Sequence, residues 1–343
     1  MKFSPVIPKD AADPANQRGN LKRAMSDLKQ RFKHIEKEVV KLVADQKQYQ
    51  KQTQANTQWR PLVFFTNSRF GIDTVKSSTA VNVAYYEYLI DDTRLQQIDR
   101  YLERLLYGDL LESFGDMPPR WFFKSYLSQS FNQAVNESIQ SYKNQADSEV
   151  LGEDIARQLL AMSRDEISPQ IMQSLGIVYS RTFNNMKGLT DSMKSDLADT
   201  LTRGMESGFG IRQITADIKK RVGVNFSRAQ RIARTEILNA FRTAQRAKTK
   251  EVNETIFDDS PFVFRQLWFS ALAGTSRKWH VSRHGSIYTQ QEVELFYSER
   301  GNSISCLCSQ SPILVERDSN EPVSGEIIKR MKKQKEAWRI SNK

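Results

Sequence analysis

Two histidines and two cysteines near the C-terminal end are the residues whose types and spacing best suit chemistry. His280 and His284 are four residues apart, Cys306 and Cys308 follow downstream, and the one remaining histidine or cysteine is His34. Two imidazoles and two thiolates can form a tetrahedral zinc site with bonds of about 2.0–2.3 Å, leaving no open position for water. The alternative is a pair of reduced cysteines in a small core, with His280 in a structural hydrogen bond. We expect no cofactor, and structural zinc stays open as the alternative.

Two enzyme hypotheses use residues close to the histidine pair. A metal-dependent nuclease would combine that pair with Glu292 or Glu294 and act on DNA held by basic segments of the chain. An ADP-ribosyltransferase would use Glu292-Val293-Glu294 with Ser77-Ser78-Thr79, but this separation is too long for one compact site. Activity that depends on added divalent metal would distinguish the nuclease from a structural protein. We assign no catalytic residue and expect the protein not to be an enzyme.

The charge of the chain is concentrated in three basic segments. The net charge of +11 divides into +7 for residues 1–60, −6 for 61–202, +9 for 203–250, −5 for 251–328 and +6 for 329–343. Clustered Lys and Arg release condensed counterions when they bind a polyanion. The distribution therefore favours double-stranded DNA as a partner over a role in solubility alone. No zinc-finger spacing, RNP motif or basic zipper is present, so we expect non-specific binding.

The C-terminal tail and the basic helix before it supply the cations that we expect to contact phosphate. These candidates are Lys329, Arg330, Lys332, Lys333, Lys335, Arg228, Arg231, Arg242 and Arg246. We expect the tail to be disordered until it meets DNA, because it combines a high net charge with few apolar residues.

An apolar heptad repeat indicates a long helix near the N-terminus. The spacing alternates between four and three residues at Leu21, Met25, Leu28, Phe32, Ile35, Val39 and Leu42, and Tyr49 fits the same register. Such a seam is typical of a coiled coil. We favour an arm that docks on a partner or on a second copy, and the alternative is an amphipathic helix packed on its own domain.

The rest of the sequence indicates a mainly α protein with a small α+β module near the C-terminus. Short strands are expected between residues 60 and 90, and a break at Gly115–Pro119. Helix caps are expected at Ser168, Thr190 and Ser227, and a glycine stop at Gly208 and Gly210. We predict a basic arm with the heptad helix at residues 1–58 and an α-rich region with short strands at 59–150. A helical region at 151–250, the α+β module at 251–320 and a basic tail at 321–343 follow.

Two absences in the composition exclude other protein classes. No uncharged apolar run approaches the roughly 20 residues that cross a bilayer, so we expect no membrane partner. Two cysteines cannot form a disulfide framework, which fits a reducing compartment such as a bacterial cytoplasm.

One stretch of the sequence resembles a known family. A glycine-containing turn at Gly204–Gly210 precedes a basic helix that reads Arg228-Ala229-Gln230-Arg231-Ile232-Ala233-Arg234-Thr235-Glu236. Trp268, the run Arg277-Lys278-Trp279-His280, His284-Gly285 and Cys306-Leu307-Cys308 follow in order. Together these motifs resemble the head-morphogenesis family of tailed phages, the Mu F-like minor capsid proteins. The family usually has an Asp shortly before the His, which residues 273–277 lack.

This resemblance covers about residues 203–315 and implies a minor capsid protein of a tailed-phage head. Its family-motif residues here are Arg234, Thr235, Glu236, Trp268 and His280. Relatives are attached to the portal protein inside the capsid and aid head assembly and DNA packaging or ejection, so major capsid or scaffold proteins are further expected partners. The expected location is the virion, after assembly in the host cytoplasm. The nuclease, acting on phage or host DNA, is the alternative function. Within the motif helix, Glu236 is expected to make an inward ion pair or hydrogen bond.

Overall fold

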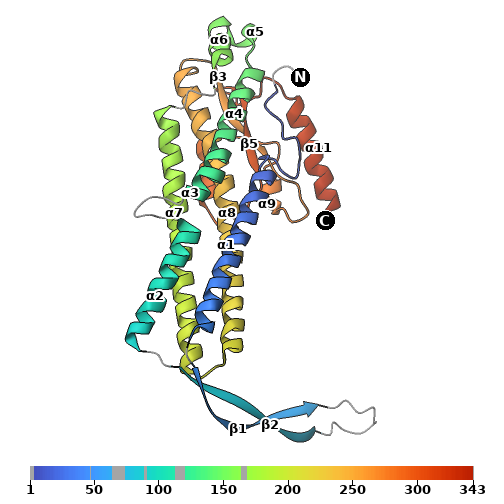
Figure 1. Ribbon diagram of the computed structural model, residues 1–343. Coiled ribbons are helices and arrows are strands. Elements are labelled where there is room, and N and C mark those ends of the chain that lie inside the picture. The colour runs from blue at the N-terminus through green and yellow to red at the C-terminus, as the bar shows by residue number, and fades with distance from the viewer. Residues whose placement is uncertain are drawn as a thin grey trace, which may run out of the picture. The chain divides into compact units, whose positions relative to one another are not determined.

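The computed structural model describes residues 4–46, 48–63, 74–88, 91–112, 120–163 and 168–342. The chain forms two compact units, each assembled from separate stretches of sequence. Unit 1 contains residues 1–30, 110–189 and 226–343, and unit 2 contains residues 31–109 and 190–225. The described residues are mostly helical, and the C-terminal part adds a three-stranded sheet (Figure 1). The predicted fold class, mainly α with a small α+β module, is confirmed.

Three long helices contribute residues to both units: α1 (Arg18–Ala44), α7 (Pro169–Glu206) and α8 (Ile211–Thr255). The other described helices of unit 1 are α3 (Arg120–Phe122), α4 (Ser128–Asn144), α5 (Ser148–Leu151), α6 (Glu153–Ala161), α9 (Lys278–Val281), α10 (Gln290–Ser298) and α11 (Glu326–Ser341). Unit 2 contains α2 (Asp92–Leu106). Two π-helical turns occur at Tyr107–Leu111 and Phe123–Leu127.

The three-stranded sheet of unit 1 is antiparallel and has helices on both faces. Its strands are β3 (Phe262–Phe269), β4 (Ile287–Tyr288) and β5 (Ser309–Glu316), in the order β4-β3-β5. One face carries the apolar residues that pack with Ile327 and Met331 of α11. The other face carries Phe264 and Leu314, which pack with residues of α4, α6 and α8. Because successive side chains of a strand point to opposite faces, β3 and β5 each contribute apolar side chains to the cores on both faces of the sheet.

Unit 2 combines a β-hairpin with helical segments. Strands β1 (Gln48–Val63) and β2 (Thr74–Tyr88) pair in an antiparallel register. The amide of Tyr86 donates a hydrogen bond to the carbonyl of Gly208, 3.0 Å away, in the turn between α7 and α8. Elsewhere in the unit, Lys194 of α7 pairs with Asp99 and Glu103 of α2 at 2.9 and 2.8 Å. The hairpin therefore joins the turn at which the two long helices reverse direction.

Two helix starts expected from the sequence lie inside continuous helices. α7 runs through Thr190 and α8 runs through Ser227, so neither residue caps a helix. Thr190 is fully buried, which indicates that packing outweighs the local preference of a capping residue. The cap at Ser168 is confirmed, because its hydroxyl accepts a hydrogen bond from the amide of Ile171 at 3.3 Å. The glycine stop is also confirmed: α7 ends at Glu206, and Gly208 has a φ of 67°.

The heptad seam of α1 is buried inside its own chain. Leu28, Phe32, Ile35 and Val39 are at most 3% exposed, so the seam is a packing surface of this fold. The docking arm that we favoured is therefore wrong, and the amphipathic helix is the correct interpretation. Tyr49 lies on β1, beyond the end of the helix at Ala44.

The basic tail forms a helix. Ile327 and Met331 of α11 are 2% and 1% exposed and pack against the sheet, so the expectation of a disordered tail is wrong. The predicted boundaries at residues 58 and 250 fall within β1 and α8. The short strands expected between residues 60 and 90 correspond to the end of β1 and to β2, whereas most of β1 lies before residue 60. Phe64 and Phe65, like the Gly115–Pro119 break, lie outside the described residues. No described helix has the length and apolar character needed to cross a membrane.

Candidate functional site

The segment of α8 that carries the RAxxIARTE sequence has an apolar face made of small residues. Ala229, Ala233, Ala240 and Ala244 are fully buried, as is Ile237. Small side chains let neighbouring elements approach the helix backbone closely. The small-residue face expected from the sequence is therefore confirmed.

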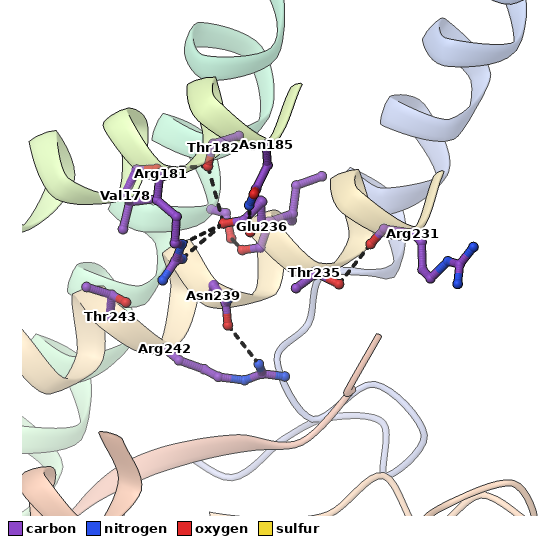
Figure 2. Close-up of polar contacts among 12 residues, drawn as sticks. Val178, Arg181, Thr182, Asn185, Arg231, Thr235, Glu236, Asn239, Arg242 and Thr243 are labelled. Atoms are coloured by element: carbon purple, nitrogen blue, oxygen red, sulfur yellow. Dashed lines mark hydrogen bonds and ion pairs between the residues drawn. The ribbon is translucent and has the colours of Figure 1, made fainter. Parts of the chain in front are cut away.

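Glu236 holds α8 to α7. Its carboxylate is buried and accepts two hydrogen bonds from the Arg181 guanidinium, at 2.9 and 3.1 Å. The amide of Asn185 donates to the second carboxylate oxygen at 3.1 Å, and the Thr182 hydroxyl donates to the first at 3.3 Å (Figure 2). The predicted inward ion pair is present. Glu236 is therefore a structural residue that joins two helices.

Thr235 and Arg242 fix the loop that carries the two cysteines. The Thr235 hydroxyl accepts a hydrogen bond from the amide of Ser305 at 3.0 Å. The Arg242 guanidinium donates to the carbonyl oxygen of Cys308 at 2.9 Å and also to that of Cys306. Both residues lie on one side of α8, because seven residues are close to two helical turns. The motif helix thus positions the Cys-x-Cys segment.

The same contacts remove Arg242 from the predicted DNA-binding residues. Its side chain is 1% exposed and lies over the ring of Tyr297, with 4.3 Å between the guanidinium carbon and the ring centroid. A guanidinium in this position cannot reach a phosphate. The sequence places Arg242 on the same helical face as Thr235, which could have indicated its structural role, but we did not predict it.

His280, Cys306 and Cys308 form a compact buried cluster. The three side chains are 2%, 6% and 4% exposed, and their candidate ligand atoms all lie within 4.8 Å of one another. Nδ1 of His280 is 3.3 Å from Sγ of Cys306 and 3.6 Å from Sγ of Cys308. Helix α9 supplies the histidine, and the loop between α10 and β5 supplies the cysteines. These are the soft ligands that the sequence analysis selected, with one exception.

The exception is His284, which belongs to a different part of the module. Its Nδ1 accepts a hydrogen bond from the amide of Ser270 at 3.1 Å, so the proton of the neutral ring is on Nε2, which faces Oε1 of Gln334 at 3.2 Å. Burial lowers the pKa of His284, which favours this neutral form. α9 ends at Val281, so His280 and His284 do not form a helical pair. His284 thus lies outside the cluster of His280, Cys306 and Cys308, and the four-ligand zinc set, kept open as an alternative from the sequence, is not assembled in this structure.

The two cysteines differ in their acidity. The hydrogen bond between the thiols lowers the pKa of Cys306, and the nearby charge of Arg242 and the hydrogen bond with His280 lower it further. The same hydrogen bond, together with burial, raises the pKa of Cys308. Cys306 is therefore the more readily ionised sulfur.

The acids proposed for a nuclease have other functions in the structure. The Glu292 carboxylate accepts a hydrogen bond from the amide of Thr289 at 2.7 Å and completes the capping box at the start of α10. The negative charge of Glu294 counteracts the burial that lowers the pKa of Arg246. With the histidine pair also separated, the nuclease hypothesis loses the arrangement on which it depended.

Trp268 is a core residue of the module. It is fully buried and stacks on Tyr297 with 5.2 Å between ring centroids, and Phe296 meets it edge-on at 5.0 Å. Phe296 also contacts His280 edge-on at 5.0 Å. The family-motif residues Trp268 and His280 therefore share one aromatic cluster.

The remaining predicted DNA-binding cations are distributed between α11 and α8. Lys329, Arg330, Lys332 and Lys333 are exposed on α11, and Arg228 and Arg231 are exposed on α8, as is the motif residue Arg234. Lys335 is half-buried and donates to the carbonyl of Ser282 at 3.1 Å; burial and two neighbouring cations lower its pKa. Arg246 is also half-buried, and burial lowers its pKa to about 10. The exposed cations of α11 are thus the densest group among the candidates.

Comparison with known proteins supports the resemblance. Residues 195–311 match the family described as Phage Mu protein F like protein. This range contains the motif segment of α8, Trp268, His280 and both cysteines. No curated protein and no solved structure matches the chain. The match supports a phage head-morphogenesis protein.

Proposed function

We propose that this chain, which is Mu F-like over residues 195–311, is a minor capsid protein docked on the portal inside a tailed-phage head. It aids head assembly and DNA packaging or ejection by binding double-stranded DNA without sequence preference. The protein does not act as an enzyme in this proposal. The family match supports the place in the head, and helix α11 supports the contact with DNA.

The observation that carries the DNA contact is the division of α11 into an anchored face and a charged face. Ile327 and Met331, four residues apart, are buried against the sheet. The indole of Trp338 donates to the carbonyl of Ala273 at 3.0 Å and fixes the other end of the helix. Four exposed cations of the helix are Lys329, Arg330, Lys332 and Lys333, and a fifth, Arg339, pairs with Glu336 at 3.5 Å. A rigid helix that presents clustered cations loses little conformational entropy on binding a polyanion.

This arrangement suits non-specific binding. Lysines neutralise phosphates as point charges, while base reading uses elements that enter a groove with defined hydrogen-bonding side chains. Affinity from such contacts falls as salt rises, with a slope of about 0.9 per neutralised phosphate. A genome-contacting head protein needs this kind of binding, because any part of the genome can pass it.

The test is the salt dependence of DNA binding after neutralisation of four exposed cations of α11. The variant replaces four residues with glutamine: K329Q, R330Q, K332Q and K333Q. Binding to two duplexes of unrelated sequence is followed by fluorescence anisotropy between about 50 and 200 mM salt. We expect equal weakening on both duplexes and a slope that is flatter by about 0.9 for each lost contact.

Two controls separate the position of the charges from their number. A charge-retaining variant, K329R with K332R and K333R, is expected to keep the parent slope. A second variant removes four exposed lysines from α1: K22Q, K29Q, K33Q and K37Q. An unchanged slope in the α11 variant would disprove the DNA role of α11. An equal drop in the α1 variant would assign the binding to net charge instead.

A further inference from the structure

The distances within the His280–Cys306–Cys308 cluster fit a metal centre. In a tetrahedral zinc site with Zn–N near 2.0–2.1 Å and Zn–S near 2.3 Å, nitrogen and sulfur ligands are about 3.6 Å apart. The observed distances from Nδ1 of His280 are 3.3 Å to Cys306 and 3.6 Å to Cys308. Both nitrogen–sulfur distances thus fit two edges of such a tetrahedron, and the two sulfurs lie within 4.8 Å of one another.

The sulfurs are held in place by contacts that involve no metal. The amide of Cys308 faces Sγ of Cys306 at 3.4 Å. Arg242 holds the carbonyl oxygens of both cysteines, and Thr235 holds the amide of Ser305, whose φ is 51°. Side chains with fixed positions lose little freedom when they bind an ion. The loop is therefore preorganised for ligation.

The histidine is also oriented from its far side. Nε2 of His280 is 3.4 Å from the guanidinium of Arg277, which donates to the carbonyls of Asn302 and Ile304 at 3.2 and 3.0 Å. Since a guanidinium is always a donor, Nε2 is the acceptor in the metal-free chain and the ring proton is on Nδ1, toward the sulfurs. With a metal at Nδ1 the neutral ring carries its proton on Nε2 instead, so the 3.4 Å contact with Arg277 is given up while Arg277 keeps its bonds to Asn302 and Ile304. Binding is weaker at low pH, because protons compete with the metal for the imidazole and the two thiolates.

A cavity of about 160 Å³ gives access to the cluster. It is lined by all three candidate ligands and by Thr275 and Arg277, among others. Three protein ligands leave one tetrahedral position for water, and this cavity can hold it. A dication with two thiolates and a neutral imidazole has no net charge, so the ion adds no repulsion beside buried Arg242.

We propose that His280, Cys306 and Cys308 bind a zinc ion, with a water molecule as the fourth ligand on the side of the cavity. Two sulfurs and one imidazole favour zinc over magnesium or calcium, which prefer oxygen ligands. The ion links α9 to the Cys-x-Cys loop and so cross-links two segments of the module that are separated in sequence.

Cobalt substitution tests the ligand set. The reduced full-length chain is stripped of metal and titrated with Co²⁺, whose thiolate charge-transfer and visible bands report sulfur ligation in a tetrahedral site. We expect one ion per chain and displacement of the cobalt by zinc. His280→Gln, Cys306→Ser and Cys308→Ser are each expected to weaken binding at least about 100-fold, beyond the 10–100-fold typical of outer-shell changes. His284→Gln, the matched control, is expected to keep the parent spectrum.

A measurement on the unmodified chain remains informative if a ligand variant fails to fold. Zinc X-ray absorption of the loaded protein is expected to show two sulfur and two nitrogen or oxygen neighbours. A shell without sulfur, or no stoichiometric binding of zinc or cobalt, would overturn the proposal and leave a cysteine pair hydrogen-bonded to His280. Equal loss of cobalt in His284→Gln and His280→Gln would restore the four-ligand set instead.

Discussion

At the scale of single residues, the motif segment of α8 serves the architecture of the protein. Glu236 fastens α8 to α7, and Thr235 and Arg242 fasten the Cys-x-Cys loop to α8. Arg234, immediately before them in sequence, is exposed. A buried carboxylate with several donors is costly to disturb, since removing one member leaves other polar groups without partners.

Replacement of Glu236 by alanine is therefore expected to destabilise the protein. We expect a loss of about 2–3 kcal/mol in the free energy of unfolding, measured with urea, because Arg181, Asn185 and Thr182 lose an ionised acceptor. The matched control is Arg234→Ala, for which a change within about 0.5 kcal/mol is expected at an exposed position. Equal stability of the two variants would contradict the structural role of Glu236.

At the scale of elements, α11 depends on its fit against the turn after α9. Gly285 lies in this turn with a φ of 76°, and a Cβ atom there would be 2.9 Å from Cβ of Met331. Position 285 therefore requires glycine for two reasons: the backbone conformation has a positive φ, and α11 approaches the backbone closely.

Gly285→Ala is expected to loosen α11. The left-handed backbone alone costs a non-glycine residue about 1–2 kcal/mol, and the contact with Met331 adds to that. We expect a lower urea midpoint and faster proteolysis within residues 326–341. Gly274→Ala is the control, because its nearest neighbour would be Asn342 Oδ1 at 3.5 Å, an ordinary contact. A variant as resistant to protease as the parent would show that α11 does not depend on this fit.

At the scale of the whole molecule, three helices are shared by two units that are discontinuous in sequence. The heptad seam of α1 packs inside the fold, since its central residues are buried. Docking on a portal, as proposed, must therefore use another surface. The cations of α11 are a separate feature, so portal binding and DNA binding are expected to be independent.

This independence predicts the result of co-expression with the portal protein of the same phage. The parent and the α11 variant with four glutamines are both expected to co-elute with the portal at fixed stoichiometry in size-exclusion chromatography. Nuclease treatment should leave both complexes intact, because the contact is between proteins. Separation of the portal from both proteins would refute docking, and loss of the complex only in the variant, or after nuclease, would show that DNA bridges the two.

The sequence by itself determined features set by local patterns. The mainly helical fold, the cap of α7 at Ser168 and the glycine stop after that helix follow from residues near one another in the chain. The motif of α8 and the order of Trp268, His280 and the cysteines were sufficient to indicate the family that residues 195–311 match.

Only the tertiary structure decided which of the chemically capable residues meet. It placed His280 with both cysteines and His284 with Ser270, a division that spacing of four residues could not reveal. It buried Arg242, the seam of α1 and one face of α11, and it ran helices through Thr190 and Ser227. In each case contacts between residues distant in sequence outweighed local propensity, because burial of apolar surface and satisfaction of buried polar groups are properties of the assembled fold.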